Sequence, residues 1–143
     1  MATKKAVATN EDVPEVFRLN IEVGDLEQAA SFYGTLLGVV GRKQAGSRVY
    51  FNCGAVTLQV VNVTAEGSPH PPHPLPKCLY FTVHDLEAVF ARAQGLGCLS
   101  KESVHGSPGG QITVKPWGER SFYADDPWGN PLCFVTAGTV YQG

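Results

Sequence analysis

An alternating segment leads into a helical one in residues 17–38, FRLNIEVGDLEQAASFYGTLLG. In residues 17–23 every second side chain is apolar, and this period of two predicts a strand with one covered and one open face. The covered face would carry Phe17, Leu19, Ile21 and Val23, and the open face Arg18, Asn20 and Glu22. Asp25 is the predicted N-cap of the following helix, and Gly38 is its predicted left-handed end.

The same arrangement returns in residues 77–97, KCLYFTVHDLEAVFARAQGLG, where Asp85 lies 60 positions after Asp25. The covered face of this second strand would hold Leu79, Phe81 and Val83, and its open face Cys78, Tyr80 and Thr82. Further strands are predicted after each helix: a hairpin in residues 47–63 that turns near Gly54, and the segments QITVKP, ERSFYAD and PLCFVTA in the second half. Each half of the chain is therefore a predicted β-α-β-β-β unit, and the repeat strengthens the assignment.

A proline-rich stretch, EGSPHPPHPLPK at residues 66–77, separates the two halves. Its five prolines favour an extended polyproline II conformation, and twelve such residues reach roughly 35 Å. That length allows the second half to pack on its own chain or on another subunit. His70 and His73 are expected to be solvent-facing loop histidines, because nothing rigid in this stretch orients them.

The predicted organisation is one domain made of two modules. A flexible N-terminal tail is expected at residues 1–15, the first module at 16–65, the linker at 66–77 and the second module at 78–143. The second module is the longer one, partly through the Gly/Pro/Ser-rich insertion HGSPGG at residues 105–110.

Composition and charge argue against several classes of protein. The net charge is −2 and there is no basic cluster, so nucleic acid is not an expected partner. No apolar run approaches the roughly 18 residues of a membrane span, and the first residues lack the apolar core of a signal peptide. The four cysteines lie far apart without a CxxC pair, as expected of reduced thiols in a cytoplasmic protein.

The ordered repeat resembles the vicinal oxygen chelate superfamily, which includes glyoxalase I, extradiol dioxygenases, fosfomycin-resistance enzymes and bleomycin-resistance proteins. The resemblance rests on NIEVGDLEQAASFYGTLLG in the first half and DDPWGNPL in the second, and WGERSFYADDPWGN looks most like bleomycin-resistance-type members. It implies an α+β fold in which two βαβββ modules form a curved mixed-sheet cup with the helices outside. It also implies a homodimer.

Metal-using members of that superfamily place His, Gln or Glu at four inward positions, and the resemblance maps these positions onto Arg18, Gln59, Cys78 and Cys133. Arginine stays protonated and has no acceptor atom, so Arg18 would repel a cation. Two thiols without a carboxylate are poor ligands for the hard divalent ions. We therefore expect no metal at these positions and no other cofactor.

Polar and aromatic side chains are expected to line the cup and to form the ligand site. The candidate residues are Arg18, Asn20, Gln59, Cys78, Tyr80, Trp117, Glu119, Ser121, Tyr123 and Cys133. Aromatic walls with a few convergent polar groups are typical of sites for small organic molecules. Arg18 is the candidate anchor for an anionic or carbonyl group. No histidine is predicted on this face, so a Cys-His nucleophile pair is not expected.

These observations favour metal-independent binding of a small organic ligand, which would sequester an antibiotic or a metabolite in the cup of a cytoplasmic homodimer. One alternative is a divalent-metal-dependent, glyoxalase-like lyase or dioxygenase. Another is a cup filled by its own side chains, with a structural or partner-binding role. The sequence leaves open which way Tyr50, Phe51 and Trp128 face.

Overall fold

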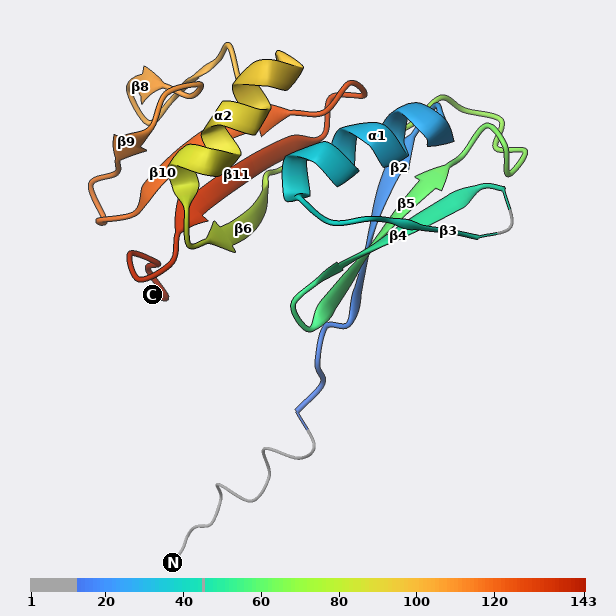
Figure 1. The fold of residues 1–143 in the computed structure, drawn as a ribbon, viewed down its shortest axis with the longest axis horizontal. Helices are drawn as coiled ribbons and strands as arrows, with labels where there is room; N and C mark the ends of the chain where they lie inside the picture. The colour runs from blue at the N-terminus through green and yellow to red at the C-terminus, as the bar shows by residue number, and fades with distance from the viewer. Residues whose placement is uncertain (1–12, 45) are drawn as a thin grey trace, which may run out of the picture.

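The computed structural model describes residues 13–44 and 46–143, so residues 1–12 of the expected tail lie outside the described part of the chain (Figure 1). The first module comprises β2 (Arg18–Val23), α1 (Leu26–Leu37), β3 (Arg42–Gln44), β4 (Arg48–Cys53) and β5 (Val56–Asn62). Its strands form one mixed sheet in the order β2-β5-β4-β3, with β2 parallel to β5 and the other neighbours antiparallel.

The second module repeats this topology with an insertion. It comprises β6 (Leu79–Val83), α2 (Leu86–Leu96), β7 (Ser103–Val104), β8 (Ser107–Pro108), β9 (Thr113–Val114), β10 (Arg120–Asp125) and β11 (Pro131–Thr136). Its main sheet has the order β6-β11-β10-β9, with β6 parallel to β11, and the small hairpin β7–β8 stands apart from it. The predicted α+β fold of two βαβββ modules is confirmed.

Both helices begin and end at the residues that the sequence predicts. Asp25 Oδ1 accepts a hydrogen bond from the Gln28 backbone N–H at 2.9 Å, and Asp85 Oδ1 accepts one from Ala88 at 3.0 Å. Each carboxylate thereby pairs an N–H group that the first helical turn leaves free. Gly38 closes α1 with φ 72°, a left-handed conformation that glycine adopts without strain.

The two modules lie side by side, with α1 and α2 on the same side of the sheets, as Figure 1 shows. A single apolar core runs beneath both helices and joins buried side chains of the first module, such as Ile21 and Phe51, to Phe122 and Phe134 of the second. Arg92 of α2 also donates to the Leu36 carbonyl of α1 at 3.2 Å. Neither helix of the described residues is long and apolar enough to cross a membrane.

The beginning of β2 departs from its predicted burial. Ile21 and Val23 are in the core, but Phe17 is 62% exposed and Leu19 39% exposed. The alternation is present, yet no element of the described chain packs over this end of the strand. The expectation that Phe17 and Leu19 lie on a covered face is therefore wrong for the single chain.

The turn between β10 and β11 ties the modules together. Asp126 Oδ1 accepts from the backbone N–H groups of Trp128 and Asn130 at 2.9 and 2.8 Å, which closes the turn. Asn130 Nδ2 then donates to the Glu22 carbonyl in β2 at 3.1 Å. Trp128 packs against Gly24, where an added Cβ would lie 3.1 Å from its indole nitrogen. Trp128 is thus a packing residue of the junction between the modules.

Candidate functional site

Three neighbouring strands of the second module bring several candidate residues together. In the register of β6, β11 and β10, Tyr80 stands beside Cys133 and Cys133 beside Tyr123. Ser121 lies on the same face, one row along, next to Val135. Leu132 and Phe134 point the opposite way into the main core, so the predicted orientation of Cys133 is confirmed.

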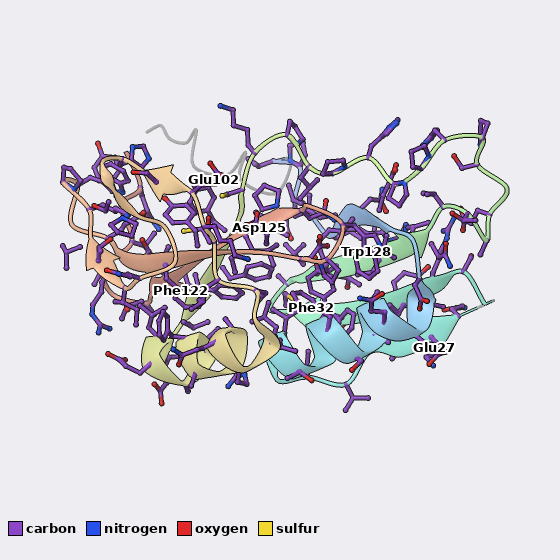
Figure 2. The ribbon with its side chains drawn as sticks, turned by 90° about the horizontal axis from the view of Figure 1, so that it is seen from above. Glu27, Phe32, Glu102, Phe122, Asp125 and Trp128 are labelled. Carbon is purple, nitrogen blue, oxygen red and sulfur yellow. The ribbon has the colours of Figure 1, made fainter. Side chains whose placement is uncertain are left out.

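This face is covered by the insertion that follows α2. Val104 of β7 and Cys78 pack on a small apolar cluster of Tyr123, Cys133 and Val135. Figure 2 shows Phe122 and helix α2 on one side of β10 and β11, and Glu102 with the β7–β8 hairpin on the other. As a result Cys133 is only 1% exposed, and Ser121 and Tyr123 are also buried.

Backbone hydrogen bonds hold the insertion against the outer edge of β10. Tyr123 accepts from Ser100 at 3.0 Å and donates to Gly109 at 2.8 Å, while Asp125 donates to Cys98 at 2.9 Å. The Lys115 ammonium lies 5.2 Å from the centre of the Tyr123 ring, at cation–π distance. The Gly/Pro/Ser-rich insertion at residues 105–110 therefore belongs to a longer segment that covers this face, and the apolar Val104 just before the insertion is a sign of this in the sequence.

Burial also determines the protonation of the two thiols. It raises the pKa of Cys133 to about 12, with the neighbouring Cys78 adding to the effect. Burial, followed by the Asp125 carboxylate, likewise raises the pKa of Cys78. A nucleophilic cysteine needs a lowered pKa, so both side chains are neutral thiols at neutral pH and not nucleophiles.

The open face of the first module carries a second group of candidates. Asn20, Gln59 and Tyr50 stand side by side on β2, β5 and β4, and Gln59 Nε2 donates to Asn20 Oδ1. Gln59 is 6% exposed, and its Oε1 has no hydrogen-bond partner among the described residues. Arg18 is exposed and its guanidinium lies 4.8 Å from the Phe17 ring centre. Tyr50 thus faces this side, and Phe51 faces the core.

Trp117 and Glu119 lie in the turn that leads into β10. Burial is the main cause of the raised pKa values of Tyr80 and Cys133, and the Glu119 carboxylate adds to both shifts, so Glu119 lies near the first group. β10 begins at Arg120 and does not extend back to Trp117, because Gly118 adopts φ 96° and turns the chain. Trp117 Nε1 instead donates to Glu119 Oε1 at 2.9 Å, and its ring meets His105 edge to face at 4.8 Å. Glu119 Oε2 accepts from the Tyr141 backbone at 2.9 Å, so the pair braces the C-terminal residues.

An apolar cleft of about 450 Å³ lies between the modules on the helix side of their sheets, where α1 contributes Leu36 and Leu37 and α2 contributes Val89 and Arg92. Leu19 of β2 and Leu79 of β6, which are equivalent in the repeat, both line it, together with Phe81 and Phe134. Tyr80, which is 61% exposed, stands at its border. The sequence gives no sign of this cleft, because the cleft depends on how the two modules are placed relative to each other.

The fold and these faces define a two-module α+β protein in which paired βαβββ units present polar open faces away from their helices. The chain belongs to the Glyoxalase/Bleomycin resistance protein/Dioxygenase superfamily, whose family model matches residues 16–134. A comparison with curated proteins gives no match.

Solved structures share the fold at low sequence identity. Oxidase ChaP-H1 is 24% identical with a TM-score of 0.71, over 92% of this chain and 100% of that one. A glyoxalase/bleomycin resistance protein from Albidiferax ferrireducens T118 is 21% identical with a TM-score of 0.67, over 83% and 95% of the two chains. Lactoylglutathione lyase from Agrobacterium tumefaciens is 21% identical with a TM-score of 0.59, over 86% and 93%. These likenesses establish the fold.

The four positions mapped to metal ligands do not offer a suitable donor set. Arg18 is a cation without a lone pair, and the two cysteines are thiols whose pKa values burial raises. Gln59 Oε1 is the one ready oxygen donor among the four. Zinc sites need three or four protein ligands, so this set does not fit a divalent ion.

Proposed function

We propose that this protein binds a small organic ligand without a metal at the four family positions, and that it sequesters an antibiotic or a metabolite. The observation that carries the proposal is the replacement of metal donors by Arg18 and by the neutral thiols of Cys78 and Cys133. A guanidinium on the open face is suited to an anionic or carbonyl group, which it can bind through two parallel hydrogen bonds.

The groups around Arg18 support this assignment. The ion pairs of the described residues use Lys43, Arg48 and Arg120, which leaves the Arg18 guanidinium available. Asn20 and the unpartnered Oε1 of Gln59 add donor and acceptor capacity on the same face of the described chain. The apolar part of the ligand would lie against the exposed ring of Tyr80 on the open face of β6. In this proposal Ser121, Tyr123 and Cys133 support the site from beneath the insertion.

We propose in addition that the protein works as a cytoplasmic homodimer. Val16, Phe17 and Leu19 form an exposed apolar row that leads along the free edge of β2, which is the kind of surface that a second copy would cover. All four cysteines are unpaired, as expected in a reducing compartment.

A ligand screen with a matched pair of arginine variants tests the function. Aromatic carboxylates and carbonyl compounds are screened by thermal shift, and the best hit is titrated calorimetrically into wild type, Arg18→Ala and Arg120→Ala. Losing a hydrogen bond to a charged group costs about 1.5–3 kcal/mol, so Arg18→Ala should weaken binding roughly ten- to hundredfold. Arg120 lies on the helix side of β10, where it pairs with Glu87 of α2, and its variant should bind like wild type. Equal binding by Arg18→Ala and wild type would contradict the proposal.

The face of the second module that points away from α2 is buried, and this burial favours one other candidate function. Ser121, Tyr123 and Cys133 are sealed by the chain's own insertion, as expected of a protein with a structural or partner-binding role. A library of aromatic and carboxylate compounds that leaves the melting temperature unchanged throughout would favour this alternative.

A further inference from the structure

The proline-rich segment 66–77, called the strap below, brings two histidines to a carboxylate of the first module. Figure 2 shows the strap running along the side of the sheets away from α1 and α2. One ligand atom each from Glu22, His70 and His73 lies within 4.8 Å of the other two. Glu22 is 48 and 51 positions before the two histidines, so only the fold brings these groups together.

The conformation of the strap aligns the two histidines with each other. A polyproline II segment has three residues per turn, so side chains three positions apart lie on the same side. His70 and His73 have this spacing, and the intervening Pro71 and Pro72 restrict the backbone. The two imidazole rings are stacked, with centres 4.0 Å apart and planes 11° from parallel.

Hydrogen bonds fasten the strap to the same strand that carries the carboxylate. His73 donates its backbone N–H to Glu22 Oε1 at 2.8 Å. Leu75 donates to Asn130 Oδ1 at 2.9 Å, and Asn130 Nδ2 donates to the Glu22 carbonyl at 3.1 Å. The buried Asn130 therefore holds the strap with one end of its amide and Glu22 with the other. The expectation that nothing rigid orients these histidines is wrong.

The tautomer of His70 also suits a metal ligand. Its Nδ1 lies 2.7 Å from the Pro71 carbonyl oxygen, and a carbonyl oxygen can only accept, so Nδ1 carries the proton. The lone pair is then on Nε2. Histidine ligands usually donate their other ring N–H to a carbonyl or carboxylate in this way, which fixes the ring for coordination.

We propose that Glu22, His70 and His73 bind a divalent transition-metal ion such as zinc. Two imidazoles and one carboxylate are donors that zinc, cobalt and nickel accept, and the half-exposed position leaves the remaining coordination sites to water. Ligand atoms in a tetrahedral zinc site lie about 3.3 Å apart, so small side-chain rotations close this cluster around the ion. A bound ion would cross-link the strap to β2.

This site uses none of the residues of the proposed ligand site. Glu22 lies on the same face of β2, about 7 Å from Asn20 and about 13 Å from Arg18 at the rise of a strand. The ion would bind at the end of the strand, where the strap crosses, and not at the four positions mapped from the family. The metal proposal therefore stands or falls independently of the function proposed above.

Metal titrations of the untagged 143-residue chain test the site. Protein freed of metal with a chelator is titrated with Zn²⁺ by calorimetry and with Co²⁺ by absorption, and the expected stoichiometry is one ion per chain. Glu22→Gln, His70→Asn and His73→Asn should each weaken binding by at least about tenfold, because even losing an outer-shell partner costs that much. His84→Asn, a histidine in the turn before α2, is the matched control and should bind like wild type.

Several results would overturn the proposal. These are no uptake of either ion, unchanged affinity in Glu22→Gln, or equal weakening in His84→Asn. A thiolate-to-cobalt charge-transfer band would place the ion at cysteines and would also overturn it. Far-ultraviolet circular dichroism of each variant separates loss of a ligand from loss of the fold, and the glutamine of Glu22→Gln retains an oxygen to accept from the His73 backbone.

Discussion

The Tyr33 hydroxyl donates a 2.6 Å hydrogen bond to Oδ2 of Asp126, joining helix α1 of the first module to the turn between β10 and β11 of the second. Both residues are buried, and the same Asp126 oxygen also accepts from Asn130 Nδ2 at 2.7 Å. Burial, and then the charge of Asp126, raises the pKa of Tyr33 well above its ordinary value. The phenol is therefore a permanent donor at the junction of the modules.

Tyr33→Phe is expected to destabilise the protein by about 1.5–3 kcal/mol, the usual value of a hydrogen bond to a charged group. The aromatic ring at position 33 keeps its packing in this variant, so the loss of stability comes from the missing hydroxyl group alone. Urea unfolding measures it, with Tyr141→Phe at the exposed C-terminus as the control. A Tyr33→Phe midpoint equal to that of wild type would show that Asp126 is satisfied without the phenol.

Local patterns in the sequence predict much of this fold. Asp25, Asp85 and Gly38 act within one helical turn, so capping rules are sufficient to place them. The face of Cys133 follows from the period of two along β11, which does not depend on the rest of the chain. The internal repeat and the resemblance to the superfamily predict the order of elements along each module, which is one strand, a helix and then three strands.

Features that depend on distant segments could not be predicted in this way. The cover over Tyr123 comes from an irregular insertion whose hydrogen bonds run to another strand. The orientation of His73 depends on Glu22, 51 positions earlier. The orientation of Trp117 depends on a local feature, because Gly118 adopts a positive φ before the strand begins, although the alternation of side chains continues past it.

Cys133 is expected to react with alkylating reagents more slowly than Cys78. It is 1% exposed and burial raises its pKa to about 12, so almost no thiolate is present at pH 8. Alkylation with iodoacetamide under native conditions, followed by peptide mass spectrometry, should modify the half-buried Cys78 before Cys133. Comparable rates at the two positions would show that the insertion opens readily.

The same pKa shift predicts a loss of stability at alkaline pH. The folded pKa of Cys133 is raised from 9.0 to about 12, so the protein releases this proton less readily when folded. Below pH 9 the thiol is neutral in both the folded and the unfolded chain, and its full contribution to the free energy of unfolding is present. As the pH rises from 9 towards 12, the unfolded chain loses this proton while the folded chain keeps it, so that contribution is lost. Cys133→Ala removes this contribution, so its melting temperature should fall less steeply than that of wild type over this range. Parallel curves would contradict the shift.

Two glycine substitutions are expected to act in opposite directions. A Cβ on Gly41 would lie 2.5 Å from Val49 Cγ2 and 2.8 Å from the Phe51 ring, so Gly41→Ala should cost about 1–3 kcal/mol by overpacking. Gly95 lies near the end of α2, and no atom of the described residues comes within 4 Å of the place that an added methyl group would take. Gly95→Ala should therefore gain up to about 1 kcal/mol from helix propensity. Thermal unfolding of both variants beside wild type tests the signs.

Phe17 is expected to be part of the interface between two copies of this chain. It is 62% exposed although its strand pattern marks it as a covered residue, and it leads into the free edge of β2. Light scattering after size exclusion should give wild type twice the chain mass of 15.3 kDa. Phe17→Asp should weaken dimerisation at least about tenfold, because it places a charge in an apolar contact.

Val40→Asp is the control for this experiment. Val40 is 92% exposed beyond the end of α1, so its variant should leave the measured mass unchanged. A monomeric wild type, or a Phe17→Asp dimer as stable as wild type, would mean that the exposed row serves another purpose.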